Sequence, residues 1–236
     1  MPLFSRVIAT AISVLFLMPI SRSLLLATLL TVLLSGCGKV MTIAPGSATD
    51  RLQQQAQQLE ADGNHRGAAQ IYLNAARTAA VPERHTLQLL AAGSLVRGDD
   101  TDQATTLLDE LAAEPLSEHN RQHYTLLRAA IALAGQRPET VMTLLAEVPE
   151  SGPFIADYRR LRANARAQNS QYFLAAEERV LLEPLLTDPE AQQVNRRAIW
   201  DAVNSLTDRE LQTLRSAPPP DILGGWMELV ELTRLY

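Results

Sequence analysis

Residues 63 to 149 repeat one short pattern three times, and this repeat constrains the fold more than any other feature of the chain. Glycine recurs at Gly63, Gly98 and Gly135, at intervals of 35 and 37 residues. After each glycine come a small or β-branched residue, a bulky one, a further apolar one and a proline. These positions are Ala68, Tyr72, Ala75 and Pro82, then Ala104, Leu108, Leu111 and Pro115, then Val141, Leu145, Val148 and Pro149. Such a pattern predicts stacked pairs of helices.

A fourth, weaker copy follows the three glycine-led ones. Its members are Asn169, Ala175, Arg179, Leu182 and Pro184. In each copy the small residue lets the second helix of a pair approach the first, the next residue fills the groove, and proline blocks continuation of the helix. Glycine and asparagine tolerate the left-handed backbone of a helix stop, so we expect that conformation at positions 63, 98, 135 and 169.

The repeat resembles the tetratricopeptide repeat, whose period is 34 residues. The tryptophan expected early in each first helix is missing, so the copies are degenerate. Aromatic residues make up only 5% of the chain, and alanine and leucine are abundant, which suits close-packed helices better than sheets. We therefore predict an all-α, tetratricopeptide-like helical-repeat solenoid over residues 50–216. The alternative is a non-repetitive helical bundle, which is also all-α.

The amino-terminal region carries the features of a bacterial lipoprotein signal. An apolar run from Leu24 to Leu34 follows Arg22 and ends in Leu34-Ser35-Gly36-Cys37, which resembles a lipobox. Cys37 is the one cysteine of the chain, and acylation would block its thiol in an oxidising compartment. Gly38 stands where an aspartate commonly signals inner-membrane retention, so we expect a lipid anchor on the periplasmic face of the outer membrane. The alternative is an ordinary secretory signal with a chance cysteine.

The chain divides around these features. Residues 1–36 form the signal peptide, and 1–17 are a candidate gene-model extension, because Met18 with Arg22 and the apolar core would be sufficient alone. The rival interpretation of 7–18 is a signal anchor. Residues 37–49 are expected to be a flexible tether, with Asp50 capping the first helix.

Past Pro184 the repeat period is lost. We predict a helix from Asn195 to Leu206, a capping box of Thr207 with Glu210, and a rigid joint from Ala217 to Pro220. Residues 217–236 then hold a terminal helix, capped by Asp221. Its apolar stripe is expected to face one side and comprises Trp226, Leu229, Leu232 and Leu235.

This last region resembles the amino-terminal domain of the LpoA family. The shared positions are Leu181, Leu182, Pro184, Leu185, Leu186, Asn195, Ile199, Trp200, Leu206, Thr207, Ile222, Leu223, Gly225, Trp226 and Leu229. Members are outer-membrane lipoproteins that activate class A penicillin-binding proteins in peptidoglycan synthesis. The resemblance implies a second, synthase-contacting domain like a periplasmic binding protein. We expect the present chain to stop before it, and hence to fold without stimulating the synthase by itself.

Charge and motifs exclude several function classes. After cleavage before Cys37 the chain keeps 19 basic residues against 26 acidic ones, which disfavours a nucleic-acid partner. No phosphate-binding glycine loop, G-x-S-x-G elbow or H-E-x-x-H motif occurs, so we expect neither an enzyme nor a cofactor. His119 and His123 are spaced for one helix face, but we expect no metal without a third ligand. His65 and His85, at helix starts, are expected on the surface.

Arg159, Arg162 and Arg166 form the candidate binding site. They share one face of a predicted helix, where guanidinium groups could grip carboxylates of an acidic partner or of peptidoglycan stem peptides. The alternative is a solvated face that pairs with Glu177 and Glu178.

Together these observations predict a lipid-anchored, non-enzymatic regulator of peptidoglycan synthesis that activates or positions a class A penicillin-binding protein. The alternatives are a generic repeat lipoprotein that scaffolds an envelope hydrolase or an outer-membrane assembly machine, and a helical-toroid enzyme such as a lytic transglycosylase, whose catalytic glutamate is not evident.

The lipobox makes a direct prediction about Cys37. Mass spectrometry of the membrane-extracted protein should show it amino-terminal and carrying several acyl chains, because one chain alone anchors only marginally. Replacing Cys37 with serine should release the protein from membranes. An unmodified Cys37 in the membrane fraction would contradict the prediction.

Overall fold

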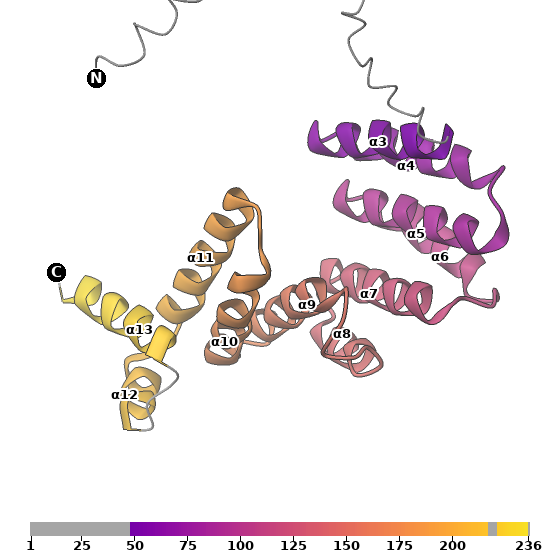
Figure 1. The fold of residues 1–236 in the computed structure, drawn as a ribbon. Helices are drawn as coiled ribbons and strands as arrows, with labels where there is room; N and C mark the ends of the chain where they lie inside the picture. Colours follow the sequence, from indigo (N-terminus) through magenta and orange to yellow (C-terminus); the bar gives the residue numbers. More distant parts are fainter. Residues whose placement is uncertain (1–47, 217–220, 236) are drawn as a thin grey trace, which may run out of the picture. The chain divides into compact units, whose positions relative to one another are not determined.

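A computed structural model describes residues 48–216 and 221–235, and all their regular structure is helical (Figure 1). Four helix pairs come first: α3 (Ala48–Ala61) with α4 (His65–Ala76), α5 (Val81–Arg97) with α6 (Thr101–Leu111), α7 (Glu118–Ala134) with α8 (Pro138–Leu145), and α9 (Ile155–Gln168) with α10 (Tyr172–Leu182). A short 3-10 turn η1 (Glu183–Leu185) leads to α11 (Pro189–Asn204), α12 (Asp208–Ser216) and α13 (Asp221–Arg234). The all-α repeat prediction is confirmed, and α3 begins two residues before the expected Asp50.

Each pair is closed by a tight turn in which one residue is left-handed. That residue is Gly63 in the first pair, with φ of 75°, but Asp99, Gln136 and Ser170 in the others, with φ of 58°, 54° and 57°. The expected left-handed conformation at positions 98, 135 and 169 is therefore wrong. The left-handed residue stands one position before the N-cap of each second helix, so the glycines at 98 and 135 end the first helix without taking that conformation.

Gly98 is required for a close approach rather than for its backbone angle. A Cβ atom at this position would lie 2.9 Å from Cβ of His65, which starts α4. The prolines also act differently from the prediction in one copy, because Pro82 lies in the first turn of α5 instead of closing the preceding unit. Proline fits there because the amide it lacks has no intrahelical partner in the first turn.

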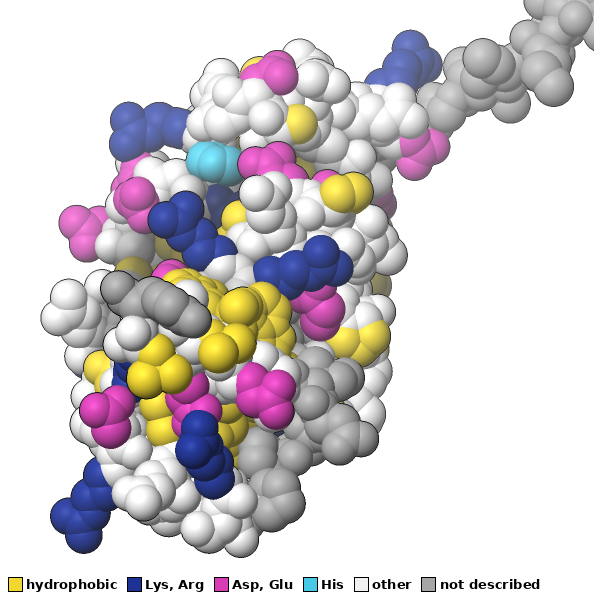
Figure 2. Space-filling model, turned by 90° about the vertical axis from the view of Figure 1, so that its left-hand side faces the viewer, with side chains coloured by type: hydrophobic (Ala, Val, Ile, Leu, Met, Phe, Trp, Pro, Cys, Tyr) yellow, Lys and Arg dark blue, Asp and Glu magenta, His cyan; other side chains and the backbone are white. Residues whose placement is uncertain are grey.

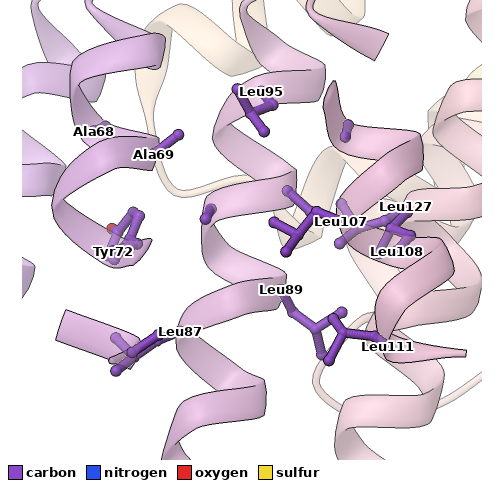
Figure 3. Packing of buried hydrophobic residues seen from close by; sticks show 14 of the residues in the cluster. Ala68, Ala69, Tyr72, Leu87, Leu89, Leu95, Leu107, Leu108, Leu111 and Leu127 are labelled. Carbon is purple, nitrogen blue, oxygen red and sulfur yellow. The ribbon is translucent and has the colours of Figure 1, made fainter. Parts of the chain in front are cut away.

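The predicted small residues of the second helices are all buried. Ala68, Ala104, Val141 and Ala175 are at most 2% exposed. The groove-filling Tyr72, Leu108 and Leu145 are buried as well. In Figure 3, Leu89 of α5 points toward Leu111 of α6, which shows how facing helices share one core. In the fourth copy the groove position holds Arg179, whose guanidinium donates hydrogen bonds to the side-chain oxygens of Asn164 and Asn195.

The last three helices, α11 to α13, do not continue the series of helix pairs. Helix α11 begins at Pro189 and not at the predicted Asn195, because Asp188 caps it by accepting hydrogen bonds from the amides of Glu190 and Ala191. The buried Asn195 instead joins α11 to α10, donating to the carbonyl of Arg179 at 2.9 Å. Thr207 and Glu210 form the predicted capping box, with reciprocal hydrogen bonds of 2.7 and 3.3 Å.

The buried face of α13 differs from the prediction. Leu223, Met227 and Val230 are buried against α11, whereas Leu229 and Leu232 are about half exposed. The residues of the predicted stripe are spaced by three, so their direction shifts by about 60° around the helix from each residue to the next. Residues spaced alternately by four and three stay on one face. Figure 2 shows hydrophobic side chains gathered on the face of the molecule to which these helices contribute. An open groove of about 600 Å³ is lined in part by Leu181, Pro184 and Trp226.

Several sequence predictions fall on residues that the structure does not describe. These are the signal peptide, Cys37, most of the tether and the proline joint of 217–220. In the described part of the chain no helix is long and apolar enough to cross a bilayer.

Because Ala104 is buried, we expect its contact between helices to have no room for a larger side chain. Ala104→Leu should lower the free energy of unfolding by about 1–3 kcal/mol, because three extra carbons must be fitted into a filled contact. Ala134→Leu, at an exposed helix position, is the matched control and should change stability by less than about 0.5 kcal/mol. Equal thermal melts for the two variants would contradict this packing.

Candidate functional site

Three arginines of α9 line the contact with α10. Arg159, Arg162 and Arg166 stand three and four residues apart, which places them along one helical face. The tight turn at Ser170 brings α10 back antiparallel, so that its residue Glu178 lies opposite this face. The single hairpin of α9 and α10 therefore brings the three arginines and Glu178 together.

Glu178 is the centre of the arrangement, which we call the arginine cluster: Arg159, Arg162, Arg166 and Glu178. Its carboxylate is buried, with 4% of the side chain exposed, and lies 2.9 Å from a guanidinium nitrogen of each arginine. Arg166 also donates to the carbonyl of Leu174, one turn earlier on α10, at 3.2 Å. Three charge-assisted contacts offset the cost of burying this carboxylate.

Arg162 extends the cluster to the segment before α9. Its two terminal nitrogens donate to the two oxygens of Glu150 at 2.6 and 3.2 Å, the bidentate geometry of a guanidinium–carboxylate pair. The hydroxyl of the buried Tyr158 donates to Glu150 at 3.1 Å and accepts from Arg162 at 2.9 Å. In contrast to Glu178, Glu150 is 58% exposed.

The protonation equilibria follow from these contacts. The hydrogen bond from Arg162 holds the pKa of Glu150 below its ordinary value. Burial by itself lowers the pKa of Arg162, but the hydrogen bonds to Glu150 and Glu178 outweigh it, so that pKa is raised. Burial raises the pKa of the Tyr158 hydroxyl. Glu150 and Arg162 therefore keep their opposite charges near neutral pH.

The structure places the predicted site residues in an ion-pair network. Three guanidinium groups face two carboxylates, Glu178 and Glu150, which leaves one net positive charge. The arginine side chains are only 11–19% exposed. Sequence reasoning named Glu178 as a partner in its alternative but missed Glu150 and Tyr158, since a loop-to-helix contact leaves no periodic signal. The arrangement can hold carboxylates, and its groups do not form a nucleophile–base pair.

The two histidines of α7 pack on one aromatic ring. The ring centroids of His119 and His123 lie 4.8 and 5.3 Å from that of Phe154, at the start of α9. Within the described residues no group of three His, Cys, Asp or Glu side chains could hold a metal ion. The prediction that His85 lies on the surface is wrong, because α5 turns this residue into the core, where it is 2% exposed.

The His123 contact predicts a pH dependence of stability. Burial, as the largest cause, lowers the pKa of His123 to about 4, and the charge of Asp157 opposes this shift. A lowered folded-state pKa means that stability is complete above the unfolded pKa of about 6.5 and falls as the pH drops toward 4, by up to about 3 kcal/mol. Denaturant melts from pH 7 to 4 should show a shallower loss in His123→Phe than in the parent. Identical pH profiles for the parent and His123→Phe would contradict the assignment.

The central carboxylate predicts the strongest stability effect in the hairpin. Glu178→Gln leaves three guanidinium groups without their shared partner and should lower the free energy of unfolding by about 3–5 kcal/mol. The matched Glu150→Gln, at the exposed end of the network, should cost less than about 1 kcal/mol. Equal losses in urea melts would show that Glu178 is not the centre.

Comparisons with known proteins agree with this architecture. Two curated relatives, named penicillin-binding protein activator LpoA, come from Shigella flexneri serotype X (strain 2002017) and Escherichia coli (strain K12). They are 31% and 30% identical over 211 residues, which cover 85% of this chain and 28% of each relative. The chain thus spans little more than a quarter of the length of these relatives.

Solved structures match the helical arrangement itself. The crystal structure of the E. coli LpoA amino terminal domain matches with a TM-score of 0.60 and 28% identity, over 71% of this chain and 77% of that one. The LpoA N-terminal domain from Haemophilus influenzae shares the fold with a TM-score of 0.63 at 23% identity, over 71% and 78% of the two chains. The family model described as LppC putative lipoprotein matches residues 62–236. The chain therefore belongs to the LppC family of putative lipoproteins.

Proposed function

We propose that this chain is a lipid-anchored periplasmic regulator of peptidoglycan synthesis that activates or positions a class A penicillin-binding protein. One observation carries the proposal: relatives named penicillin-binding protein activators align over 85% of the chain. The lipobox ending in Cys37, followed by Gly38, supports an anchor in the outer membrane.

Regulation of this kind requires binding rather than chemistry, and paired helices suit it because they hold surface groups rigidly. In this proposal the arginine cluster is the ligand site. Glu150 occupies the fork of Arg162 in the same bidentate geometry that a partner's carboxylate would adopt. Since Glu150 is exposed and Glu178 is buried, a carboxylate of an acidic partner or of a peptidoglycan stem peptide can replace Glu150 while Glu178 holds the arginines in place.

The test is binding of a purified class A penicillin-binding protein to the immobilised mature chain. The parent should retain the synthase, and Glu150→Gln should retain it about two- to fivefold more strongly, because the Arg162 fork is freed. Glu147→Gln removes an equal charge nearby at an exposed position and should change nothing. Failure to retain the synthase, together with retention of an envelope hydrolase or assembly protein, would replace the proposal with the scaffold function.

A glycan-polymerisation assay separates positioning from activation. We expect the mature chain alone to leave the polymerisation rate unchanged, which corresponds to a positioning role for the helical domain. Stimulation as strong as that by full-length E. coli LpoA would instead place an activating surface on the helices described here.

A further inference from the structure

A polar cavity lies between α4, α5 and α6, far along the sequence from the arginine cluster. Its volume is about 470 Å³, within the range of about 300–1,000 Å³ that is usual for small-ligand sites. Part of its wall is apolar and continuous with the core through Ala76 and Leu107. The remaining wall contains Arg77, Arg84, Gln88 and Glu110.

The two arginines of this cavity differ from those of α9. The three arginines of the cluster all pair with carboxylates. In contrast, no ion pair within the described residues involves Arg77 or Arg84. Arg77 caps the end of α4 and Arg84 lies in the first turns of α5, so the loop between these helices brings both to one cavity. Two such guanidinium groups form a receptor for a carboxylate.

Gln88 adds a second recognition element. Its side-chain oxygen is buried and has no hydrogen-bond partner among the described protein groups. A buried acceptor without a donor costs roughly 1–3 kcal/mol. Rotation of the Gln88 side chain into the cavity would let a ligand N–H group recover that cost. The lining thus combines cations for a carboxylate with an acceptor for an N–H group.

The charge balance of the lining further limits the class of ligand that the cavity can bind. Glu110 is the one acid in the lining, so the cavity carries a net charge of one positive unit from two arginines and one glutamate. That balance matches a single carboxylate and disfavours a polyanion such as phosphate, which Glu110 would repel. A carboxylate next to an amide N–H is the chemistry of a peptide's carboxyl end.

We propose that this cavity binds the free carboxyl end of a peptide, with Arg77 and Arg84 on the carboxylate and Gln88 on the neighbouring amide. The inference stands on the cavity, and only the choice of peptide sources rests on the envelope location in the proposed function. A peptide carboxylate in the envelope can come from a peptidoglycan stem peptide, which ends in D-alanine, or from the carboxyl terminus of a protein, which has L-residues. The two sources share this chemistry and differ in chirality.

The experiment is calorimetric titration of the full chain, purified in detergent, with acetyl-alanyl-alanine in its D,D and L,L forms. At least one form should bind about tenfold more tightly than the same dipeptide with an amidated end, since the amide lacks the charge that the arginines recognise. Preference for the D,D form assigns the site to stem peptides, and preference for the L,L form assigns it to protein termini. Equal binding of the acid and the amide, or tighter binding of inorganic phosphate, would overturn the proposal.

Variants locate the binding on the cavity. The double variant Arg77→Gln/Arg84→Gln should weaken binding of the preferred dipeptide at least about tenfold, and Glu110→Gln should strengthen it about two- to fivefold. The matched control Arg51→Gln/Arg197→Gln removes two exposed arginines elsewhere and should change affinity less than about twofold. Circular dichroism verifies that each variant is folded. Equal affinity in the cavity variant and the control would place any binding outside the cavity.

Discussion

The turn between the two helices of each pair is the constraint on which the rest of the structure depends. One left-handed residue, at 63, 99, 136 and 170, is followed at once by the N-cap of the second helix. Four residues after that cap stands the buried small residue that contacts the first helix. Because the chain reverses within three residues, the facing side chains are fixed, and each pair offers a defined surface to the next.

The same turn creates the candidate binding site. In the fourth pair it sets Glu178 opposite three arginines, so the basic face predicted along α9 is paired with a buried carboxylate inside the hairpin. What remains accessible is the exposed Glu150–Arg162 contact. Under the proposed function, a partner's carboxylate would replace Glu150, and the buried Glu178 would keep the hairpin folded.

The sequence predicted the helices, their pairing and the buried small residues, since these follow from local periodicity and from residue size. It misplaced the left-handed residue at Gly98 and Gly135, because glycine also serves close approach, as the neighbouring His65 shows. The predicted start of α11 was wrong, although Asp188-Pro189 is a pair that favours a helix start. The predicted buried face of α13 was also wrong, because its residues were spaced by three throughout. Glu150 and Tyr158 reach the site through tertiary contacts of a loop, which no spacing in the sequence encodes.

The most direct measurement is the stability of two neighbouring variants in the third turn. Gln136→Gly should raise the free energy of unfolding by about 0.5–1 kcal/mol, because it removes the strain of a left-handed side chain. Gly135→Ala should be tolerated within about 0.5 kcal/mol, because this glycine has an ordinary backbone angle and only the Arg137 side chain must shift. The opposite result, with Gly135→Ala strongly destabilising and Gln136→Gly not stabilising, would contradict the register on which the repeat and the candidate site depend.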